Sequence, residues 1–207
     1  MTIFDEVAEK WDKDPIRQER AAKVAADMRR GVPLARAWRA MEFGCGTAQL
    51  SFYLHRELGH ITLVDTSAGM LEVVKRKIAA AGSANMTPLL ADLTKGKLPD
   101  GRFDLIYTMM ALHHIPSPER VMAIFRNLLR KGGYLCIAEL EKGETSFHGE
   151  DFEGHDGFTR RELEEMVVRE GFEKVKIDTC FAMQRCDGKG NLQEFNVLLL
   201  ICRRGEG

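Results

Sequence analysis

The sequence predicts an α/β fold in which helices cover both faces of a mostly parallel sheet. Apolar, β-branched runs alternate with helical patterns along the chain, which is the order that a parallel sheet requires. A glycine-rich stretch at residues 41–50 joins the first apolar run to a helical pattern. Near the C-terminus the apolar runs 175–180 and 195–202 have no helix between them, only turn-forming residues at 187–191. We therefore expect a C-terminal hairpin and an antiparallel last strand.

Cap and stop residues place the elements in chain order. Ser67 can cap one helix, Ser117 followed by Pro118 and Glu119 can open another, and residues 159–162 read Thr-Arg-Arg-Glu, a capping box. Glycines end most of the helical patterns. The expected helices cover residues 4–11, 21–31, 50–59, 67–82, 117–133 and 159–171. The expected strands cover residues 36–42, 61–65, 85–90, 103–108, 134–138, 175–180 and 195–202.

The glycine-rich stretch is the strongest functional signal in the chain. Gly44 and Gly46 permit positive φ and let another group approach the backbone closely, while the following helix points unpaired N–H groups into the same space. A dinucleotide fingerprint needs a third glycine where this chain has Gln49, and the Gly-Lys-Ser/Thr end of an ATPase phosphate loop is missing. Without further signals, a turn that binds no ligand would be the simplest interpretation.

A carboxylate follows the glycine-rich stretch at a sequence spacing that suits nucleotide binding. Asp65 ends the second expected strand and lies 23 positions after Glu42. An acid at the tip of that strand can accept hydrogen bonds from both ribose hydroxyls of a nucleotide. Asp65 alone does not distinguish a nicotinamide enzyme from other nucleotide-binding proteins.

Four segments in order resemble the class I S-adenosylmethionine-dependent methyltransferases. Residues 42–47, Glu-Phe-Gly-Cys-Gly-Thr, are similar to the first motif of that family, although Ala48 replaces its frequent third glycine. Asp65, the Ala-Asp-Leu at 91–93 and the Leu-His-His-Ile at 112–115 follow in the expected places. The resemblance spans roughly residues 4–202. It implies a Rossmann-like, seven-stranded sheet with one antiparallel strand near its edge.

The same resemblance implies S-adenosyl-L-methionine as cofactor and S-adenosyl-L-homocysteine as product. Gly44 and Gly46 would allow the cofactor's methionine and ribose portion to approach the backbone, and Glu42 would orient the loop or the cofactor's amino group. Asp65 would hold the ribose hydroxyls and Asp92 the adenine amino group. The further expected contacts are Trp11, Cys45, Thr66, Met70, Ala91, Leu93 and Thr108. Met70 suits either the adenine face or an ordinary helix core, and Trp11 either a cofactor cover or core packing.

No catalytic residue follows from the resemblance, because the family shares a cofactor motif and no catalytic group. His113, His114 and His155 are candidates for a base or a hydrogen-bond donor to the acceptor. His113 and His114 are adjacent and cannot both face one ligand from a regular strand or helix. The alternative is that one of them packs under the loop and the other is solvated. No regular ligand spacing indicates a metal.

We expect one methyltransferase domain over residues 1–207. Within it, residues 1–32 would form an N-terminal helical cover and residues 36–139 the cofactor-binding core. Residues 140–158 would form a lid-like insertion, because residues 143–157 are polar and rich in glycine. Residues 159–202 would form the C-terminal helix and hairpin.

Composition limits the partners. With 30 basic and 31 acidic residues the net charge is −1, which gives no electrostatic case for a large nucleic-acid surface. No apolar run approaches the ~20 residues of a membrane span, and the N-terminus lacks a secretory pattern. Five cysteines in apolar or motif contexts favour reduced thiols and a cytoplasmic protein. The sequence does not indicate an oligomeric state.

A small-molecule acceptor is the favoured interpretation. No Asn/Asp-Pro-Pro-Tyr/Phe or Pro-Cys follows the fourth expected strand, which disfavours the nucleic-acid methylases that carry those motifs. A protein or RNA methyltransferase, or a non-catalytic module that binds S-adenosylmethionine or S-adenosylhomocysteine, stays open. The second helix is basic, with Arg17, Arg20, Lys23, Arg29 and Arg30. We interpret it as a solvated face, and an anionic acceptor or an RNA patch is the less favoured alternative.

Overall fold

The structure is a computed structural model of the 207-residue chain. It describes residues 3–96, 98–143, 147, 152–186 and 192–206. The N-terminal half contains α1 (Ile3–Trp11), α2 (Pro15–Gly31), β1 (Arg39–Phe43), α3 (Gln49–Leu54), β2 (His60–Asp65), α4 (Ala68–Ala81), β3 (Met86–Leu90) and the 3₁₀ helix η1 (Leu93–Lys95). The C-terminal half contains β4 (Phe103–Met109), the 3₁₀ helix η2 (Leu112–His114), α5 (Pro118–Leu128), β5 (Leu129–Leu140), α6 (Arg160–Arg169), β6 (Phe172–Cys186) and β7 (Leu192–Arg204).

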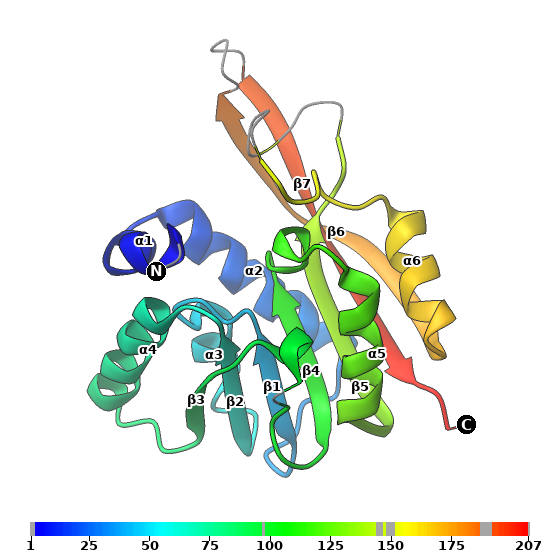
Figure 1. The fold of residues 1–207 in the computed structure, drawn as a ribbon, viewed down its shortest axis with the longest axis horizontal. Helices are drawn as coiled ribbons and strands as arrows, with labels where there is room; N and C mark the ends of the chain where they lie inside the picture. The colour runs from blue at the N-terminus through cyan, green and yellow to red at the C-terminus, as the bar shows by residue number, and fades with distance from the viewer. Residues whose placement is uncertain (1–2, 97, 144–146, 148–151, 187–191, 207) are drawn as a thin grey trace.

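The strands form a seven-stranded sheet in the order β3-β2-β1-β4-β5-β7-β6 (Figure 1). Strand β7 pairs antiparallel with both of its neighbours, and the other strand pairs are parallel. Because β7 lies between β5 and β6, the hairpin places its last strand inside the sheet. The expected Rossmann-like, mostly parallel sheet with one antiparallel strand near its edge is confirmed.

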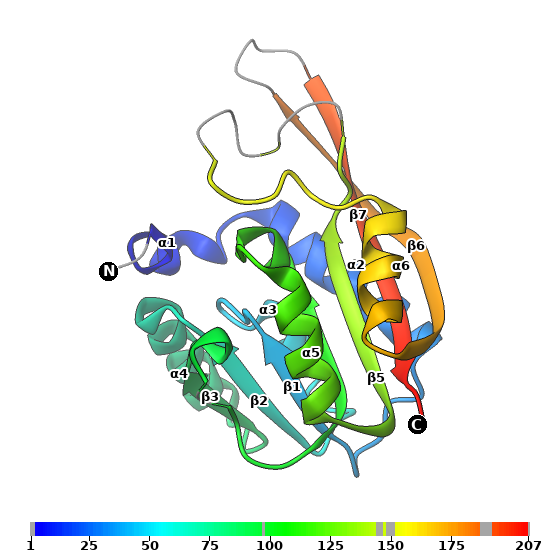
Figure 2. The ribbon, with the colours of Figure 1, turned by 45° about the vertical axis from the view of Figure 1, so that its right-hand side comes forward.

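Helices cover both faces of this sheet, as Figures 1 and 2 show. One buried cluster joins α2, α3 and α4 to one face of the strands, and the other joins α5 and α6 to the opposite face. Alternate residues of the central strands supply the two clusters, since successive side chains of a strand point to opposite faces. In β4, Leu105 and Tyr107 belong to the first cluster, whereas Ile106 between them belongs to the second.

The N-terminal helix α1 is fastened to the start of α4 by polar contacts. The Asp5 carboxylate accepts hydrogen bonds from the Ser67 hydroxyl at 2.5 Å and from the Gly69 backbone N–H at 2.9 Å. Lys77 of α4 bonds to the Asp12 carboxylate at 2.7 Å, just beyond the end of α1. These contacts hold α1 over the carboxyl edge of the sheet, where Figure 1 places it.

Some element boundaries differ from those expected. Helix α3 ends at Leu54, before the expected stop at Gly59. Helix α5 ends at Leu128, and β5 runs through Gly132 instead of beginning after it. Leu129 already pairs with Phe103 of β4, and the register then shifts, so the glycine with φ +70° belongs to an irregular strand rather than a helix stop.

The structure contains some of the predicted helix caps and differs from others. The capping box from Thr159 to Glu162 is confirmed, and the Ser67 hydroxyl accepts from the Met70 N–H at 3.1 Å. Ser117 makes no side-chain cap bond, although Pro118 does open α5. The hairpin strands β6 and β7 extend beyond the expected ranges. The turn at 187–191 lies outside the described residues, as do 144–146 and 148–151 of the expected lid-like insertion.

Candidate active site

The glycine loop after β1 lies at the carboxyl edge of the sheet. Gly44 has φ +62° and Gly46 has φ +51°, and a Cβ atom at Gly44 would lie 2.5 Å from the Cβ of Ala111. Glycine is therefore required at 44 by both backbone and packing. At Gly46 the nearest atom to an added Cβ is Trp11 Nε1 at 3.9 Å. This second glycine faces open space, which is bounded by the side chain of Trp11.

Asp65 joins the glycine loop to the end of β2. Its carboxylate accepts hydrogen bonds from the Gly46 N–H at 2.7 Å and from the Ser67 N–H at 2.8 Å. Burial raises the pKa of Asp65, and these backbone donors act in the opposite direction. The bonds fix the carboxylate beside the loop, where it forms part of a cavity wall.

Glu42, the last acid of β1, is buried in a network that the sequence did not reveal. The Ser51 hydroxyl donates to its carboxylate, and the Ser51 oxygen lies 2.5 Å from the Tyr107 hydroxyl oxygen. Burial raises the pKa of Glu42 from 4.5 to about 8, although the Ser51 bond lowers it. The Glu42 carboxyl is therefore largely protonated at neutral pH in this structure.

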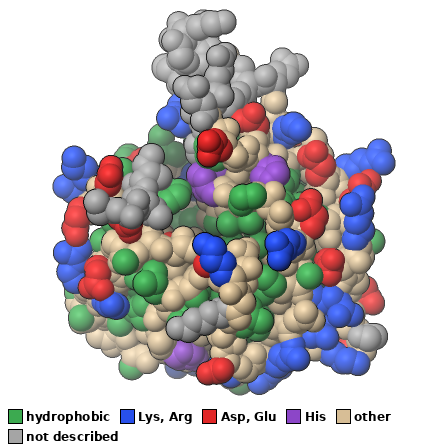
Figure 3. All heavy atoms as spheres, viewed as in Figure 1, with side chains coloured by type: hydrophobic (Ala, Val, Ile, Leu, Met, Phe, Trp, Pro, Cys, Tyr) green, Lys and Arg blue, Asp and Glu red, His purple; other side chains and the backbone are tan. Residues whose placement is uncertain are grey.

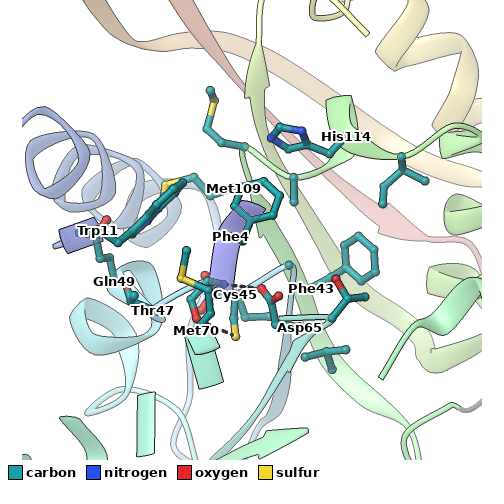
Figure 4. Close-up of a pocket in the computed structure, with 18 of the residues that line it drawn as sticks. Phe4, Trp11, Phe43, Cys45, Thr47, Gln49, Asp65, Met70, Met109 and His114 are labelled. Atoms are coloured by element: carbon teal, nitrogen blue, oxygen red, sulfur yellow. Dashed lines mark hydrogen bonds between the residues drawn. The ribbon is translucent and has the colours of Figure 1, made fainter. Parts of the chain in front are cut away.

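These residues enclose a cavity of about 140 Å³, which we call the glycine-loop cavity. Figure 4 shows Phe4 and Trp11 of α1 reaching into the same space as Asp65 and Met70. Nine of the expected cofactor contacts lie in its wall, namely Trp11, Glu42, Gly44, Cys45, Gly46, Asp65, Thr66, Met70 and Ala91. Nine of the twelve expected contacts therefore lie around one cavity, and their role as cofactor contacts stays a prediction.

Three expected contacts lie elsewhere. The Asp92 carboxylate accepts from the Thr94 N–H at 3.0 Å and from its hydroxyl at 2.6 Å, which caps η1. The Thr94 hydroxyl lowers the pKa of Asp92. Leu93 packs in the core beneath α5, and Thr108 is buried, with no partner for its hydroxyl among the residues that the structure describes. The structure does not bring these side chains to the cavity.

Several residues of the cavity wall were not expected from the sequence. Gln49 is buried, and its side-chain nitrogen has no hydrogen-bond partner in the described part of the chain. Met110 contributes to the wall with φ +55°, an unusual backbone conformation for a residue with a side chain. Phe4, Arg20 and Ala111 also line it. No short sequence pattern marks these positions, because the fold brings them together from separate segments.

A second, larger cavity of about 740 Å³ adjoins the first, and we call it the arginine cavity. Three arginines, Arg17, Arg20 and Arg185, are part of its wall, together with aromatic side chains. Five residues line both cavities: Phe4, Trp11, Arg20, Met110 and His114. The two spaces are therefore separated only by a thin shared wall.

The histidine candidates take three different positions. His113 is buried, and its Nδ1 lies 2.6 Å from a carboxylate oxygen of buried Glu139. Burial alone would raise the pKa of Glu139, but His113 and the backbone N–H groups of Leu112 and Leu140 outweigh it and leave that pKa lowered. His114 lies in the shared wall rather than in solvent, and its ring centroid is 5.1 Å from that of Phe4.

His155 supports this loop and lies in neither cavity wall. Its backbone N–H bonds to the His113 carbonyl at 2.8 Å, and its Nε2 lies 3.0 Å from the Ile115 carbonyl.

Within the described part of the chain, no group of three or more His, Cys, Asp or Glu is arranged to hold a metal ion. The described helices include none that is long and apolar enough to cross a membrane. In Figure 3, charged side chains of both signs surround a centre of apolar and histidine side chains.

Comparisons with known proteins find methyltransferases among the relatives of this chain. Residues 41–137 match the model of a methyltransferase domain. An uncharacterized methyltransferase of Mycobacterium tuberculosis is 30% identical over 97 residues, which are 47% of this chain and 48% of that protein. A phosphatidylethanolamine N-methyltransferase of Cereibacter sphaeroides is 33% identical over 105 residues, which are 50% and 51% of the two chains. The chain thus matches about half the length of these relatives.

Solved structures share the fold over nearly the whole chain. A chain from the complex of a methyltransferase activator and the putative methyltransferase of Haloferax volcanii has a TM-score of 0.76 at 15% identity, covering 100% of this chain and 99% of that one. The N-methyltransferase NodS from Bradyrhizobium japonicum, solved with S-adenosylhomocysteine, has a TM-score of 0.72 at 14% identity, covering 95% and 91%. With the motif order and this sheet, these matches support a relation to the class I S-adenosylmethionine-dependent methyltransferases, and the solved structures show that the fold is shared.

Proposed function

We propose that the protein transfers the methyl group of S-adenosylmethionine to a small molecule. The observation that carries this proposal is the thin wall between the two cavities. The glycine-loop cavity would take the cofactor and the arginine cavity the acceptor, and Met110 and His114 line both. Two binding spaces that meet at one wall suit a reaction in which a group passes directly from one ligand to the other.

The residues around the glycine-loop cavity fit the cofactor. The Gly46 side is open to the cavity, and Asp65 holds a carboxylate beside it for the ribose hydroxyls. The unpartnered side-chain nitrogen of buried Gln49 is a donor that awaits an acceptor such as a carboxylate or hydroxyl oxygen. Met70 and the α1 side chains supply apolar surface. Asp92 lies outside this wall, where its carboxylate caps η1.

The cofactor supplies an activated methyl group on a sulfonium centre, so the protein's main task is to align the acceptor. Alignment of this kind can lower a barrier by up to ~7–11 kcal/mol. His114 stands in the shared wall, where it can accept a proton from the acceptor or donate a hydrogen bond. Glu139 bonds to His113 and to backbone N–H groups, and so fixes the loop that carries His114. Acceptors that are already deprotonated would need no base.

The size and lining of the arginine cavity favour a small molecule over a macromolecule. Its volume of about 740 Å³ falls within the range typical of sites for small ligands. Phe147 and Phe152 line it together with α1 and α2, so aromatic and apolar surface surrounds the acceptor. Two relatives are named as N-methyltransferases of (S)-coclaurine and of phosphatidylethanolamine, which favours an acceptor that is neither a protein nor a nucleic acid.

The test is methyl transfer from S-adenosylmethionine with a labelled methyl group. The purified chain is assayed with panels of small acids, amines, phenols and thiols, and separately with RNA and with protein extract. We expect turnover with a member of the small-molecule panel. Labelling of RNA or protein alone would support the other methyltransferase class instead. Tight S-adenosylmethionine binding without any turnover would indicate a non-catalytic module.

A matched pair of histidine variants tests the site. His114→Ala removes a side chain from the shared wall, whereas His60→Ala alters the first residue of β2, at the opposite edge of the sheet. If the acceptor must lose a proton, we expect kcat/KM to fall by about 10²–10⁴ in the first variant and little in the second. Equal activity in both would remove His114 from the mechanism.

A further inference from the structure

The arginine cavity has an unusual charge balance. Arg17 and Arg20 of α2 and Arg185 near the end of β6 all line it, and Asp14 is the only acid among its described lining residues. Asp14 is already engaged, because its carboxylate accepts from the Ile16 N–H at 3.0 Å and lies 3.4 Å from Arg17 Nε. Among its described lining residues, the cavity therefore holds more positive charge than the acids can balance.

Arg20 is the centre of this imbalance. Only 7% of Arg20 is exposed, its Nε has no hydrogen-bond partner among the described residues, and its Nη1 lies 3.9 Å from the sulfur of Met183. Glu139, the buried acid that acts on it, is bonded to His113. Burial and, to a lesser degree, the charge of Arg17 lower the pKa of Arg20 from 12.5 to about 10. The solvated-face interpretation is therefore wrong for Arg20.

A buried guanidinium without a carboxylate partner is costly to a fold. The cost is offset when a ligand supplies the missing anion, and the planar donor fork of arginine matches a carboxylate or phosphate well. Arg20 lines both cavities, so its unpartnered side chain borders the spaces that ligands would occupy. This is the arrangement expected of a binding residue rather than a structural one.

The other two arginines are held in place by aromatic rings. Arg17 lies 3.7 Å from the ring centroid of Trp11, and Arg185 lies 4.9 Å from that of Phe147. Arg185 also donates to the Phe147 carbonyl at 3.0 Å. Burial lowers the pKa of Arg17, and the charge of Arg185 lowers it as well, so the two cations act on each other across the cavity. Each guanidinium thus lies beside an apolar surface.

We infer that the acceptor carries an anionic group, a carboxylate or a phosphate, which binds at Arg20 with Arg17 and Arg185 beside it. Its apolar or aromatic body packs against Phe147 and Phe152. That the bound molecule is the methyl acceptor rests on the proposed function. The anion site itself rests on the cavity alone.

A second anion could reach Arg20 from the other side of the wall. The carboxylate of the cofactor's methionine portion would occupy the glycine-loop cavity, which Arg20 also lines. Arg17 and Arg185 line only the arginine cavity. Variants of Arg20 and Arg185 therefore separate the two sources of the anion.

The experiment compares 3-phenylpropionate, 2-phenylethyl phosphate and the neutral 3-phenylpropanamide by calorimetric titration, with and without S-adenosylhomocysteine. The full chain is used as wild type, Arg20→Gln, Arg185→Gln and the control Arg30→Gln. Arg30 lies on the same helix as Arg20, and its side chain is 67% exposed. Circular dichroism and S-adenosylhomocysteine titration report on the fold of each variant.

We expect wild type and Arg30→Gln to bind at least one of the two anions tenfold or more tightly than the amide. Arg185→Gln should lose about tenfold of that preference and keep its S-adenosylhomocysteine affinity, and Arg20→Gln should lose most of the preference. Equal binding of anions and amide by wild type would overturn the inference, and so would a preference unchanged in Arg185→Gln. Loss of S-adenosylhomocysteine binding in Arg20→Gln with its anion preference intact would assign Arg20 to the cofactor and overturn it too.

The anion preference is measured without the cofactor as well, so the two proposals can fail separately. A chain that prefers the anions but binds no S-adenosylhomocysteine would contradict the proposed function and leave the anion site standing. A chain that binds S-adenosylhomocysteine without any anion preference would do the reverse. If Arg20→Gln does not fold, the exposed Arg185 still gives the decisive comparison.

Discussion

Replacing Glu42 by glutamine should abolish a large part of the pH dependence of stability. The Glu42 carboxyl is buried at the end of β1 with a pKa raised from 4.5 to about 8, chiefly because burial disfavours its charged form. Between these two values the folded chain binds more protons at this site than the unfolded chain does. The free energy of unfolding must therefore fall as pH rises through this window and level off above pH 8.

The size of the effect follows from the shift. One pKa unit corresponds to about 1.4 kcal/mol, so the full shift costs the folded chain about 5 kcal/mol above pH 8. About two of these units lie between pH 6 and pH 8, so wild type should lose about 3 kcal/mol between pH 6 and pH 9 through Glu42. For a chain of this length that corresponds to roughly 6–12 °C in melting temperature. Glutamine is neutral throughout and can still accept the bond from Ser51.

The assay is urea unfolding followed by circular dichroism at pH 6, 7.5 and 9, without adenosyl ligands and with reductant present. The control is Glu164→Gln, which changes an exposed glutamate of α6. Other titrating groups are common to all three proteins and cancel in the differences. The stability of Glu42→Gln relative to wild type should rise by about 3 kcal/mol from pH 6 to pH 9. Parallel profiles for Glu42→Gln and wild type would refute a buried, proton-binding Glu42.

Three further changes test the packing and fastening of the site. Gly44→Ala places a Cβ 2.5 Å from the Cβ of Ala111 at positive φ, so urea unfolding should show a stability loss of about 2–4 kcal/mol. Adding Ala111→Gly should recover part of this loss. Full stability in Gly44→Ala would contradict the packing. Glu139→Gln leaves His113 without its carboxylate and should cost about 3–5 kcal/mol at pH 7. The pKa of Glu139 is lowered on folding, so its ionised carboxylate stabilises the fold above its unfolded pKa, and this stabilisation is lost as pH falls through the folded value. A Glu139→Gln variant whose free energy of unfolding falls in acid as that of wild type does would contradict this pair. Asp5→Ala removes two hydrogen bonds to the start of α4 and should lower the free energy of unfolding by about 1 kcal/mol. Amide hydrogen exchange should become faster in α1 but not in α5. Unchanged exchange in α1 would show that these bonds do not hold α1 in place.

The sequence located the features that depend on local chain signals. Gly44 and Gly46 mark the loop because few other residues adopt its backbone, and Asp65 ends a strand whose partners share the same sheet edge. The box at Thr159 is likewise read from residues within one turn. The order of strands and helices follows from hydrophobic patterns, so the fold class could also be predicted from the sequence.

The missed features depend on contacts between distant segments. Arg20 shares the helical spacing of buried Val24 and Met28, but a basic side chain is usually solvated, and its contact with Met183 of β6 lies 163 positions away in the sequence. Glu139 follows an apolar strand, but its partner His113 lies 26 positions earlier. Asp92 stands at the expected motif position, yet it bonds to the backbone of its own 3₁₀ helix, a local competition that asparagine and aspartate often enter. Side-chain direction at that position depends on the loop conformation, which the sequence pattern does not specify.

The most direct test of the account is calorimetric titration of the purified chain with S-adenosylmethionine and S-adenosylhomocysteine, with NAD as a control ligand. Wild type and Asp65→Ala are compared, because the Asp65 carboxylate lies beside the glycine loop in the cavity wall. We predict saturable binding of both adenosyl compounds, no binding of NAD, and affinity weakened at least tenfold by the substitution. Binding of NAD instead, or no binding of any of the three, would contradict the proposed methyl transfer and leave the glycine loop a structural turn.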